Sequence, residues 1–111
     1  SAGKGAAGSA DQVRCSAKLD VSGQIIDAVG EGNGPIDAFV HALERAINEP
    51  FEVEYYHEQS EESGSHARAL CLVGLKDADD SICWGAGVSH NTVTASFEAV
   101  LASLNRRSQQ G

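Results

Sequence analysis

The sequence predicts an α+β fold of two pseudo-repeated, strand-rich units, each ending in a helix that packs on an antiparallel or mixed sheet. Two observations support this class. Segments with alternating apolar residues are twice followed by a segment with helical apolar spacing. In addition, the chain resembles itself when it is shifted by 57 residues. This shift superimposes small residues: Gly30 on Gly87, Ala38 on Ala95, and Ala42 on Ala99.

The first unit is expected to be two strands and a helix. Residues 13–21 alternate between apolar and polar side chains, which predicts a half-buried strand. Ser22-Gly23 predicts a hairpin turn, and residues 24–29 form the second strand. The first helix is expected over residues 35–48, with Glu49-Pro50 ending it. Its apolar face consists of Ile36, Phe39, Val40, Leu43 and Ile47.

The second unit is expected to have three strands before its helix. The strands are predicted near residues 51–57, 67–76 and 82–88, with a polar mobile loop at 59–65 and a turn at 77–80. The run Leu70–Val73 predicts burial on both faces of the middle strand. The second helix is expected from Asn91 or Thr92 to Arg106. Its predicted apolar stripe is Val93, Phe97, Val100, Leu101 and Leu104.

Length and composition set the domain organisation. A chain of 111 residues suits one domain, which we place at residues 12–107. Residues 1–11 have the composition of a flexible linker or an expression remnant, and residues 108–111 that of a disordered tail. The net charge of -8 makes nucleic acid and anionic membranes poor partners. No apolar run approaches the roughly 20 residues that cross a bilayer, and no signal peptide is visible.

The stretch Gly30-Glu31-Gly32-Asn33-Gly34 before Pro35 is the strongest local signal for a site. Its glycines permit positive φ and close backbone approach. Because it opens onto a helix N-terminus, it favours an anionic group such as a carboxylate or phosphate. The similar stretch at residues 87–92 precedes the second helix. Neither a Walker loop nor a complete GxGxxG motif is present, so an ordinary strand-to-helix turn is the alternative.

The cysteines and histidines leave other functions open. The three cysteines form no CxxC pair and are interpreted as small buried residues, which weakly favours a reducing, cytoplasmic setting. Cys83 and His90 raise the alternative of a cysteine hydrolase. His57 and His66 flank the polar, acidic loop at residues 59–65, where a metal site is the less favoured alternative. A solvated strand face and loop explain the acidic residues between 49 and 62 better than a metal site does.

Several runs together resemble the C-terminal regulatory domain of the 2-isopropylmalate synthases. They are Gly30–Ala38, Glu54–Glu58 and Trp84–Val88, followed by Thr94–Ser96 and Leu104–Arg106. The resemblance extends from about Gln12 to Arg107. Citramalate synthases carry a similar domain.

The resemblance implies an α+β regulatory domain that forms a homodimer and binds leucine. Leucine would inhibit a separate catalytic barrel that joins acetyl-CoA to 2-oxoisovalerate, an acyl transfer in cytoplasmic leucine biosynthesis. This fragment is then expected to have no catalytic residues, no cofactor and no metal. The alternatives are an isoleucine-sensing domain of a citramalate synthase and a plain dimerisation module without a ligand.

The family pattern also implies the ligand residues. The first loop would contribute Gly32, Asn33 and Gly34, and the second Val88, Ser89 and His90. Tyr55, Ala67 and Ala69 would surround the ligand side chain. We therefore expect Gly34→Val to block the ligand and to destabilise the fold. Ala69→Leu is expected to block the ligand with little effect on folding.

Overall fold

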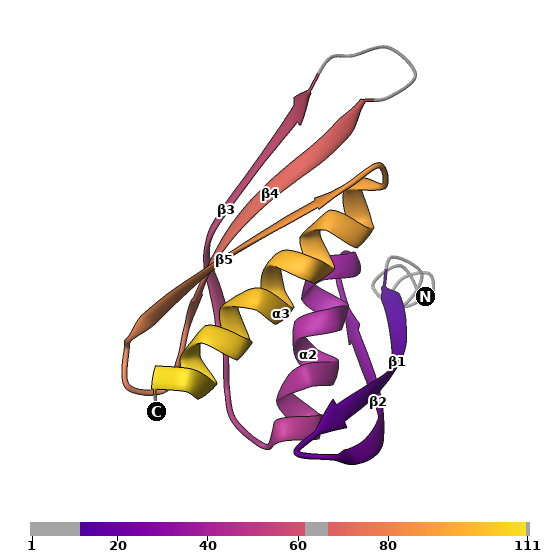
Figure 1. Cartoon of the computed structure of the whole chain (residues 1–111). Coiled ribbons are helices and arrows are strands. Elements are labelled where there is room, and N and C mark those ends of the chain that lie inside the picture. Colours follow the sequence, from indigo (N-terminus) through magenta and orange to yellow (C-terminus); the bar gives the residue numbers. More distant parts are fainter. Residues whose placement is uncertain (1–11, 62–66, 111) are drawn as a thin grey trace, which may run out of the picture. The chain divides into compact units, whose positions relative to one another are not determined.

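A computed structural model describes residues 12–61 and 67–110. The chain divides into two compact units, with the boundary between Glu49 and Pro50 (Figure 1). Both consist of antiparallel strands followed by a helix, so the predicted α+β class is confirmed. The predicted linker at residues 1–11 lies outside the described residues.

The first unit contains strands β1 (Val13–Val21) and β2 (Gln24–Gly32) and helix α2 (Pro35–Ile47). The strands pair from Val13↔Gly32 to Val21↔Gln24. The predicted turn lies between them, where Ser22 and Gly23 have φ of 54° and 85°. The helix ends at Asn48, whose φ of 63° is left-handed and whose N–H donates to the Glu44 carbonyl at 2.7 Å.

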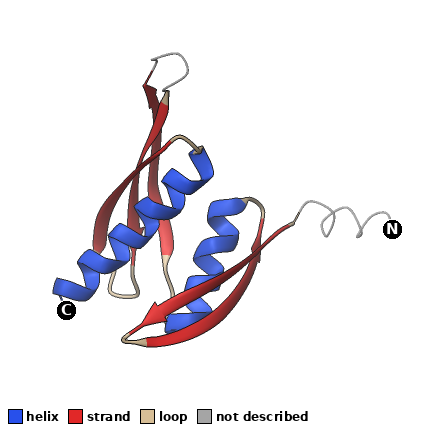
Figure 2. Cartoon of the chain, turned by 45° about the vertical axis from the view of Figure 1, so that its right-hand side comes forward, coloured by secondary structure: helices blue, strands red, loops and turns tan. Residues whose placement is uncertain are grey.

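The second unit contains β3 (Glu52–Glu61), β4 (Arg68–Lys76), β5 (Ile82–Ser89) and helix α3 (Thr92–Gln110). Its strand order is β3-β4-β5, and α3 packs against β4 and β5. Figure 2 shows each helix lying along its own sheet. Neither of the two described helices is long and apolar enough to span a membrane.

The internal repeat is confirmed where each helix meets its sheet. A Cβ on Gly30 would lie closer than 3.0 Å to backbone atoms of Ala38 and Ala42. A Cβ on Gly87 would lie equally close to backbone atoms of the corresponding residues, Ala95 and Ala99. Both glycines therefore allow a helix backbone to lie directly on a strand.

The expectation that the whole Gly30–Gly34 stretch is a loop is wrong, and its glycines do not use the positive φ that they permit. Strand β2 continues to Gly32, which leaves only Asn33 and Gly34 between strand and helix. Among the described glycines, only Gly23 has a positive φ. Position 30 requires glycine because the backbone of helix α2 lies directly against it, and not because its φ is positive.

The predicted apolar stripe of the second helix is also partly wrong. Val93 and Leu101 are exposed, whereas the buried face of α3 is built mainly from small residues. Its members are Ala95, Ser96, Ala99, Val100 and Ser103. The reason is the close approach to β5: a Cβ on Gly85 would collide with the backbone of Ala99 and Ser103, so large side chains do not fit there.

Three further boundaries differ from the prediction. Residues 59–61 belong to β3 and not to a loop, while the rest of that predicted loop lies outside the described residues. Residues 108–110, assigned to a tail, continue α3. Leu70 and Leu72 are exposed, so β4 is buried on one face only.

Candidate functional site

The start of helix α2 is formed by Asn33, Gly34 and Pro35. Gly34 is the N-cap residue, and its carbonyl accepts a hydrogen bond from the Ala38 N–H at 2.9 Å. No side chain caps this turn. Gly34 has a φ of -157°, and a Cβ placed on it would meet nothing within 4 Å. The helix start is therefore open to an approaching group.

A carboxylate of the chain lies next to this opening. Asp37, in the first turn of α2, accepts a hydrogen bond from the Asn33 N–H at 3.0 Å. Its other oxygen lies 3.6 Å from Nε2 of His41, whose Nδ1 contacts the Glu31 carbonyl. A Cβ on Gly32 would collide with the Asp37 carboxyl, so that glycine provides space for Asp37. The sequence pattern gave one signal for Asp37, because an acidic residue three positions after the N-cap commonly bonds back to the chain.

The start of helix α3 is closed by its own side chains. Asn91 accepts a hydrogen bond from the Thr94 N–H at 3.0 Å, and its carbonyl accepts one from the Ala95 N–H. Ser89 Oγ accepts from the Asn91 N–H at 3.1 Å. His90 Nδ1 lies 3.0 Å from the Ala67 carbonyl, which ties this turn to the residue before β4. Of the two helix starts, only that of α2 lacks a side-chain cap.

The predicted ligand residues of the second unit lie on two faces of its sheet. Tyr55 pairs with Gly74, and Val88 pairs with Leu70, on the face away from α3. Ala69 and its partner Ser89 lie on the face that α3 covers, and Ala69 is only 4% exposed. Because strand side chains alternate, Ala69 does not share a surface with Tyr55 and Val88. Ala67, the residue before β4, is exposed.

The burial of Ala69 changes the expected effect of two substitutions. A leucine at position 69 would overpack the region between the sheet and α3, which typically costs about 1–3 kcal/mol. A valine at Gly34 has open space and extended backbone, which β-branched residues adopt readily, so its cost is that of an apolar residue at an N-cap. The structure therefore reverses the expected order of destabilisation: we now expect Ala69→Leu, which strains the core, to cost more than Gly34→Val.

Trp84 is not among the residues that the sequence predicts for a site. Its ring stacks on Tyr55, with centroids 5.1 Å apart and an interplanar angle of 27°. Both rings are substantially exposed on the face of the sheet away from α3. The alternation along β5 indicated which residues share a face with Trp84, but only the strand register shows that Tyr55 lies beside it.

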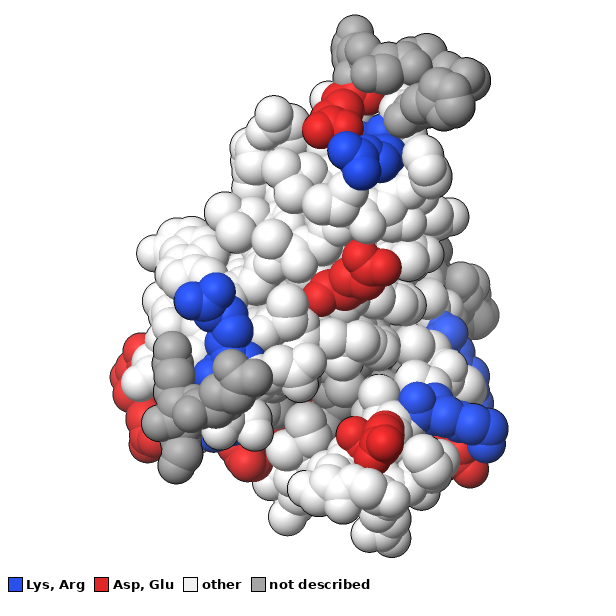
Figure 3. All heavy atoms as spheres, in the orientation of Figure 1, with Lys and Arg blue, Asp and Glu red and all other residues white. Residues whose placement is uncertain are grey.

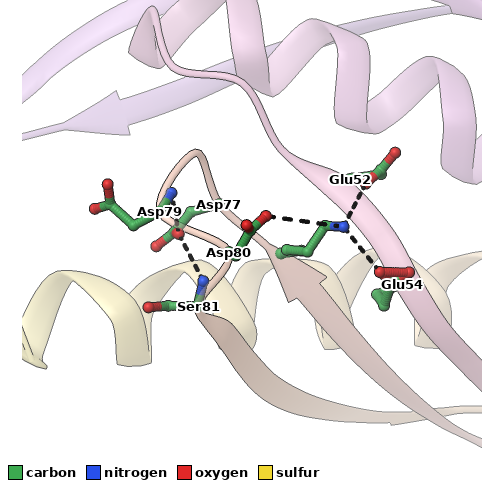
Figure 4. A network of polar contacts seen from close by, with 7 residues as sticks. Glu52, Glu54, Asp77, Asp79, Asp80 and Ser81 are labelled. Atoms are coloured by element: carbon green, nitrogen blue, oxygen red, sulfur yellow. Dashed lines mark hydrogen bonds and ion pairs between the residues drawn. The ribbon is translucent and has the colours of Figure 1, made fainter.

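Several carboxylates of the acidic stretch around residues 49–62 form ion pairs within the chain. Lys76 Nζ lies 3.3 Å from Glu52 and 3.1 Å from Glu54, and Asp80 lies at 4.0 Å (Figure 4). Asp77 accepts hydrogen bonds from the N–H groups of Asp79 and Ser81 in the neighbouring turn (Figure 4). Within residues 12–61 and 67–110, no three His, Cys, Asp or Glu side chains gather as metal ligands.

The charged residues on the face shown in Figure 3 form no extended basic patch, and two hollows lie on the described surface. On that face, acidic and basic side chains form small separate groups with wide uncharged areas between them (Figure 3). Two surface hollows, of about 330 and 400 Å³, are lined by residues around Lys76 and around Lys18. Neither is lined by a predicted ligand residue.

The geometry does not support the cysteine hydrolase alternative. Cys83 is buried near the start of β5, and His90 follows the end of that strand. At about 3.3 Å per residue, the seven steps between them correspond to roughly 23 Å. A nucleophile and its base need hydrogen-bond contact.

The fold and the helix starts define a small strand-and-helix domain in which one of the two helix N-termini is open. Comparison with protein families shows that residues 6–108 match the LeuA allosteric (dimerisation) domain. The chain belongs to this family.

The relatives in which such a domain is found are 2-isopropylmalate synthases. The protein of that name from Parafrankia sp. (strain EAN1pec) is 42% identical over 106 residues, which is 95% of this chain and 18% of the relative. The one from Cupriavidus taiwanensis is 40% identical over 94 residues, 85% of this chain and 16% of the relative. The mitochondrial 2-isopropylmalate synthase 2 of Saccharomyces cerevisiae is 36% identical over 94 residues. The chain thus spans less than a fifth of the length of these relatives.

Proposed function

We propose that this chain is the leucine-sensing regulatory domain of a 2-isopropylmalate synthase and gives feedback inhibition of that enzyme. In this proposal it acts as a homodimer attached to a catalytic domain of the parent enzyme. Membership of the allosteric domain family supports the regulatory role. The chain alone is then expected to carry out no condensation of acetyl-CoA with 2-oxoisovalerate.

The observation that carries the ligand proposal is the open start of helix α2. A free amino acid presents a carboxylate, and a helix N-terminus favours an anion through its N–H groups and its dipole. At Gly34 no side chain occupies this position, and the backbone leaves room for a ligand to approach. Asp37 lies beside the opening, within reach of an ammonium group that sits next to the carboxylate.

Two further readings share this geometry. An isoleucine-sensing domain would use the same carboxylate site, since leucine and isoleucine differ only in the position of a methyl group, worth about 1–3 kcal/mol. A dimerisation module without a ligand would leave the α2 start in contact with water. Titration with leucine, isoleucine and valine in turn distinguishes these readings.

Calorimetric titration of the chain with leucine tests the proposal. We expect binding by the parent chain and at least about tenfold weaker binding, or about 1.4 kcal/mol, by Gly34→Val. The weakening is expected because the valine side chain would occupy the space next to the N–H groups of the first turn. Gln24→Val is the matched control, because Gln24 is exposed at the opposite end of β2.

Unchanged leucine affinity in a folded Gly34→Val variant would place the ligand away from the α2 start. Binding of isoleucine alone would identify the citramalate-type sensor. A parent chain that binds none of the three amino acids would favour the plain dimerisation module. Circular dichroism confirms that each variant is folded, which the open surroundings of Gly34 lead us to expect.

A further inference from the structure

The three-stranded sheet of the second unit has one face without a covering helix. Helix α3 covers the face that carries Cys71 and Val73. The opposite face, which we call the open sheet face, carries five large apolar side chains with exposures of 38% to 51%. They are Tyr55, Leu70, Leu72, Trp84 and Val88.

The strand register makes these side chains neighbours. Leu70 pairs with Val88 on β5, and Gly74 pairs with Trp84 on β5 and with Tyr55 on β3. A Cβ on Gly74 would lie between 3.1 and 3.2 Å from side-chain atoms of Trp84, Ile82 and Tyr55. Gly74 therefore lets the stacked rings lie flat over β4. The result is an exposed platform that is apolar on β4, on β5 and at Tyr55, while His57 and Gln59 of β3, which pair with Leu72 and Leu70, make its remaining edge polar.

Charged residues lie at the two ends of this platform. At one end, Arg68 Nη2 lies 3.1 Å from Glu61. At the other end, Lys76 pairs with Glu52 and Glu54. An apolar centre with charged groups at its rim is the anatomy of a protein–protein interface. Because the rim charges already pair within the chain, they need no partner charge across the interface.

We propose that the open sheet face is the surface through which two copies of this chain associate, face to face about a twofold axis. This inference rests on the homodimer of the proposed function and assigns it a surface. A twofold interface must be self-complementary, because each copy presents the same patch. An apolar platform meets this condition, since apolar side chains pack equally well against their own kind. The family's printed description as a dimerisation domain favours a second copy over other occupants.

The size of the face sets the expected strength. Three strands about 4.8 Å apart, with nine residues at about 3.3 Å each, make a footprint on the order of 14 by 30 Å. Such a footprint belongs to the small end of specific interfaces. Dissociation is therefore expected to be measurable by dilution.

The single tryptophan of the chain reports on this surface directly. Trp84 is 43% exposed, so its burial in a dimer should shift its emission to shorter wavelength. We expect this shift to appear as the chain is concentrated from the micromolar to the millimolar range, in step with dimer formation in analytical ultracentrifugation. Leu72→Lys places a charge in the middle of the face and should weaken association at least about tenfold.

Leu101→Lys is the matched control. Leu101 is also a partly exposed leucine, 37% compared with 41% for Leu72, but it lies on α3. The control should dimerise as the parent chain does. A Leu72→Lys variant that dimerises normally, or a Leu101→Lys variant that does not, would assign the dimer to another surface and overturn the inference.

Leucine titration separates this inference from the proposed function. A chain that binds leucine but stays monomeric, or dimerises elsewhere, would overturn the interface and leave the sensing proposal standing. A chain that dimerises through the open sheet face without binding leucine would support the interface and refute the sensor.

Discussion

The most direct test of the packing is the substitution of two glycines in the same strand-to-helix stretch. A Cβ on Gly30 would lie closer than 3.0 Å to the backbone of Ala38 and Ala42, while a Cβ on Gly34 would meet nothing within 4 Å. The atoms that obstruct Gly30 belong to helix backbone and are unable to rotate away. The helix must shift as a whole, or separate from the sheet.

The expected difference can be worked from these contacts. Overpacking costs about 1–3 kcal/mol, and rigid backbone places Gly30→Ala near the upper value. Replacing glycine by alanine also restricts the unfolded chain, which stabilises by about 0.4–1 kcal/mol where the native backbone suits alanine. Gly34→Ala receives the same gain, but it also places alanine at the N-cap, where alanine is less favourable than glycine, so its net effect should be close to zero. Since Gly30→Ala combines the overpacking cost with the gain, we expect the free energies of unfolding of the two variants to differ by about 2 kcal/mol.

Urea unfolding followed by far-ultraviolet circular dichroism measures this difference. The repeat supplies an internal check, because Gly87→Ala should cost about as much as Gly30→Ala, and Trp84 fluorescence follows the second unit. If Gly30→Ala unfolds at the same urea concentration as Gly34→Ala, the helix does not lie on the strand as described. The close-approach argument would then be refuted for the first unit.

Two further predictions concern the thiols and an ion pair. Cys71 and Cys83 are buried and Cys15 is half-buried. A thiol reagent should therefore label only Cys15 in the native chain, and it should do so slowly because burial raises the pKa of the Cys15 thiol. In denaturant, all three cysteines should be labelled. Rapid native labelling of a Cys15→Ser variant would contradict this burial. Arg107 donates a hydrogen bond to Asp77 at 3.1 Å, which holds the pKa of the Asp77 carboxyl below its usual range. The pair therefore stabilises the fold above about pH 4, and this stabilisation is lost as the pH falls through the folded-state pKa of Asp77. Asp77→Asn should therefore lose less stability than the parent chain in acid unfolding, and an equal loss would show that the pair contributes nothing.

Alternation along single strands was enough to predict most of the sheet. The β1–β2 hairpin was predicted because apolar residues alternate on both sides of Ser22-Gly23. Strand β3 was predicted too short because Gln59, Ser60 and Glu61 have polar side chains. Strand pairing uses backbone groups, so an edge strand tolerates such residues while it pairs with β4.

Helix positions were predicted better than helix faces. The expected stripe of α3 assumed that its largest apolar residues are the buried ones. The structure buries Ala95, Ala99 and Ser103, because Gly85 and Gly87 bring the helix backbone onto β5. The Ser103 hydroxyl reaches the Cys83 carbonyl at 2.6 Å, so a polar residue is satisfied in this tight contact. A count of hydrophobic residues does not detect packing that depends on small side chains.

The candidate site was the least predictable part. Alternation shows which residues of one strand share a face. It does not show which residues of the neighbouring strand lie on that same face of the sheet, because this depends on the register. The family pattern placed Tyr55 and Ala69 around the same ligand side chain, whereas the register of β3 on β4 puts them on opposite faces of the sheet. The same register brings Tyr55 beside Trp84, a pairing for which the sequence offered no signal.

The two repeats have the same contacts where each helix packs on its strand, but they differ at the helix N-termini, where a ligand could approach. Gly30 and Gly87 contact equivalent backbone atoms of their helices, so both units keep the same solution for placing a helix on a sheet. At the helix starts the similarity ends: Asn91 caps α3 with its side chain, whereas Gly34 leaves α2 uncapped. Relative to glycine, an N-cap side chain such as that of Asn91 adds a few tenths of a kcal/mol to stability. The α2 start lacks this contribution without any steric need for glycine, because a side chain at position 34 would fit. This asymmetry points to the α2 start, and not to both loops equally, as the place where the proposed leucine carboxylate binds.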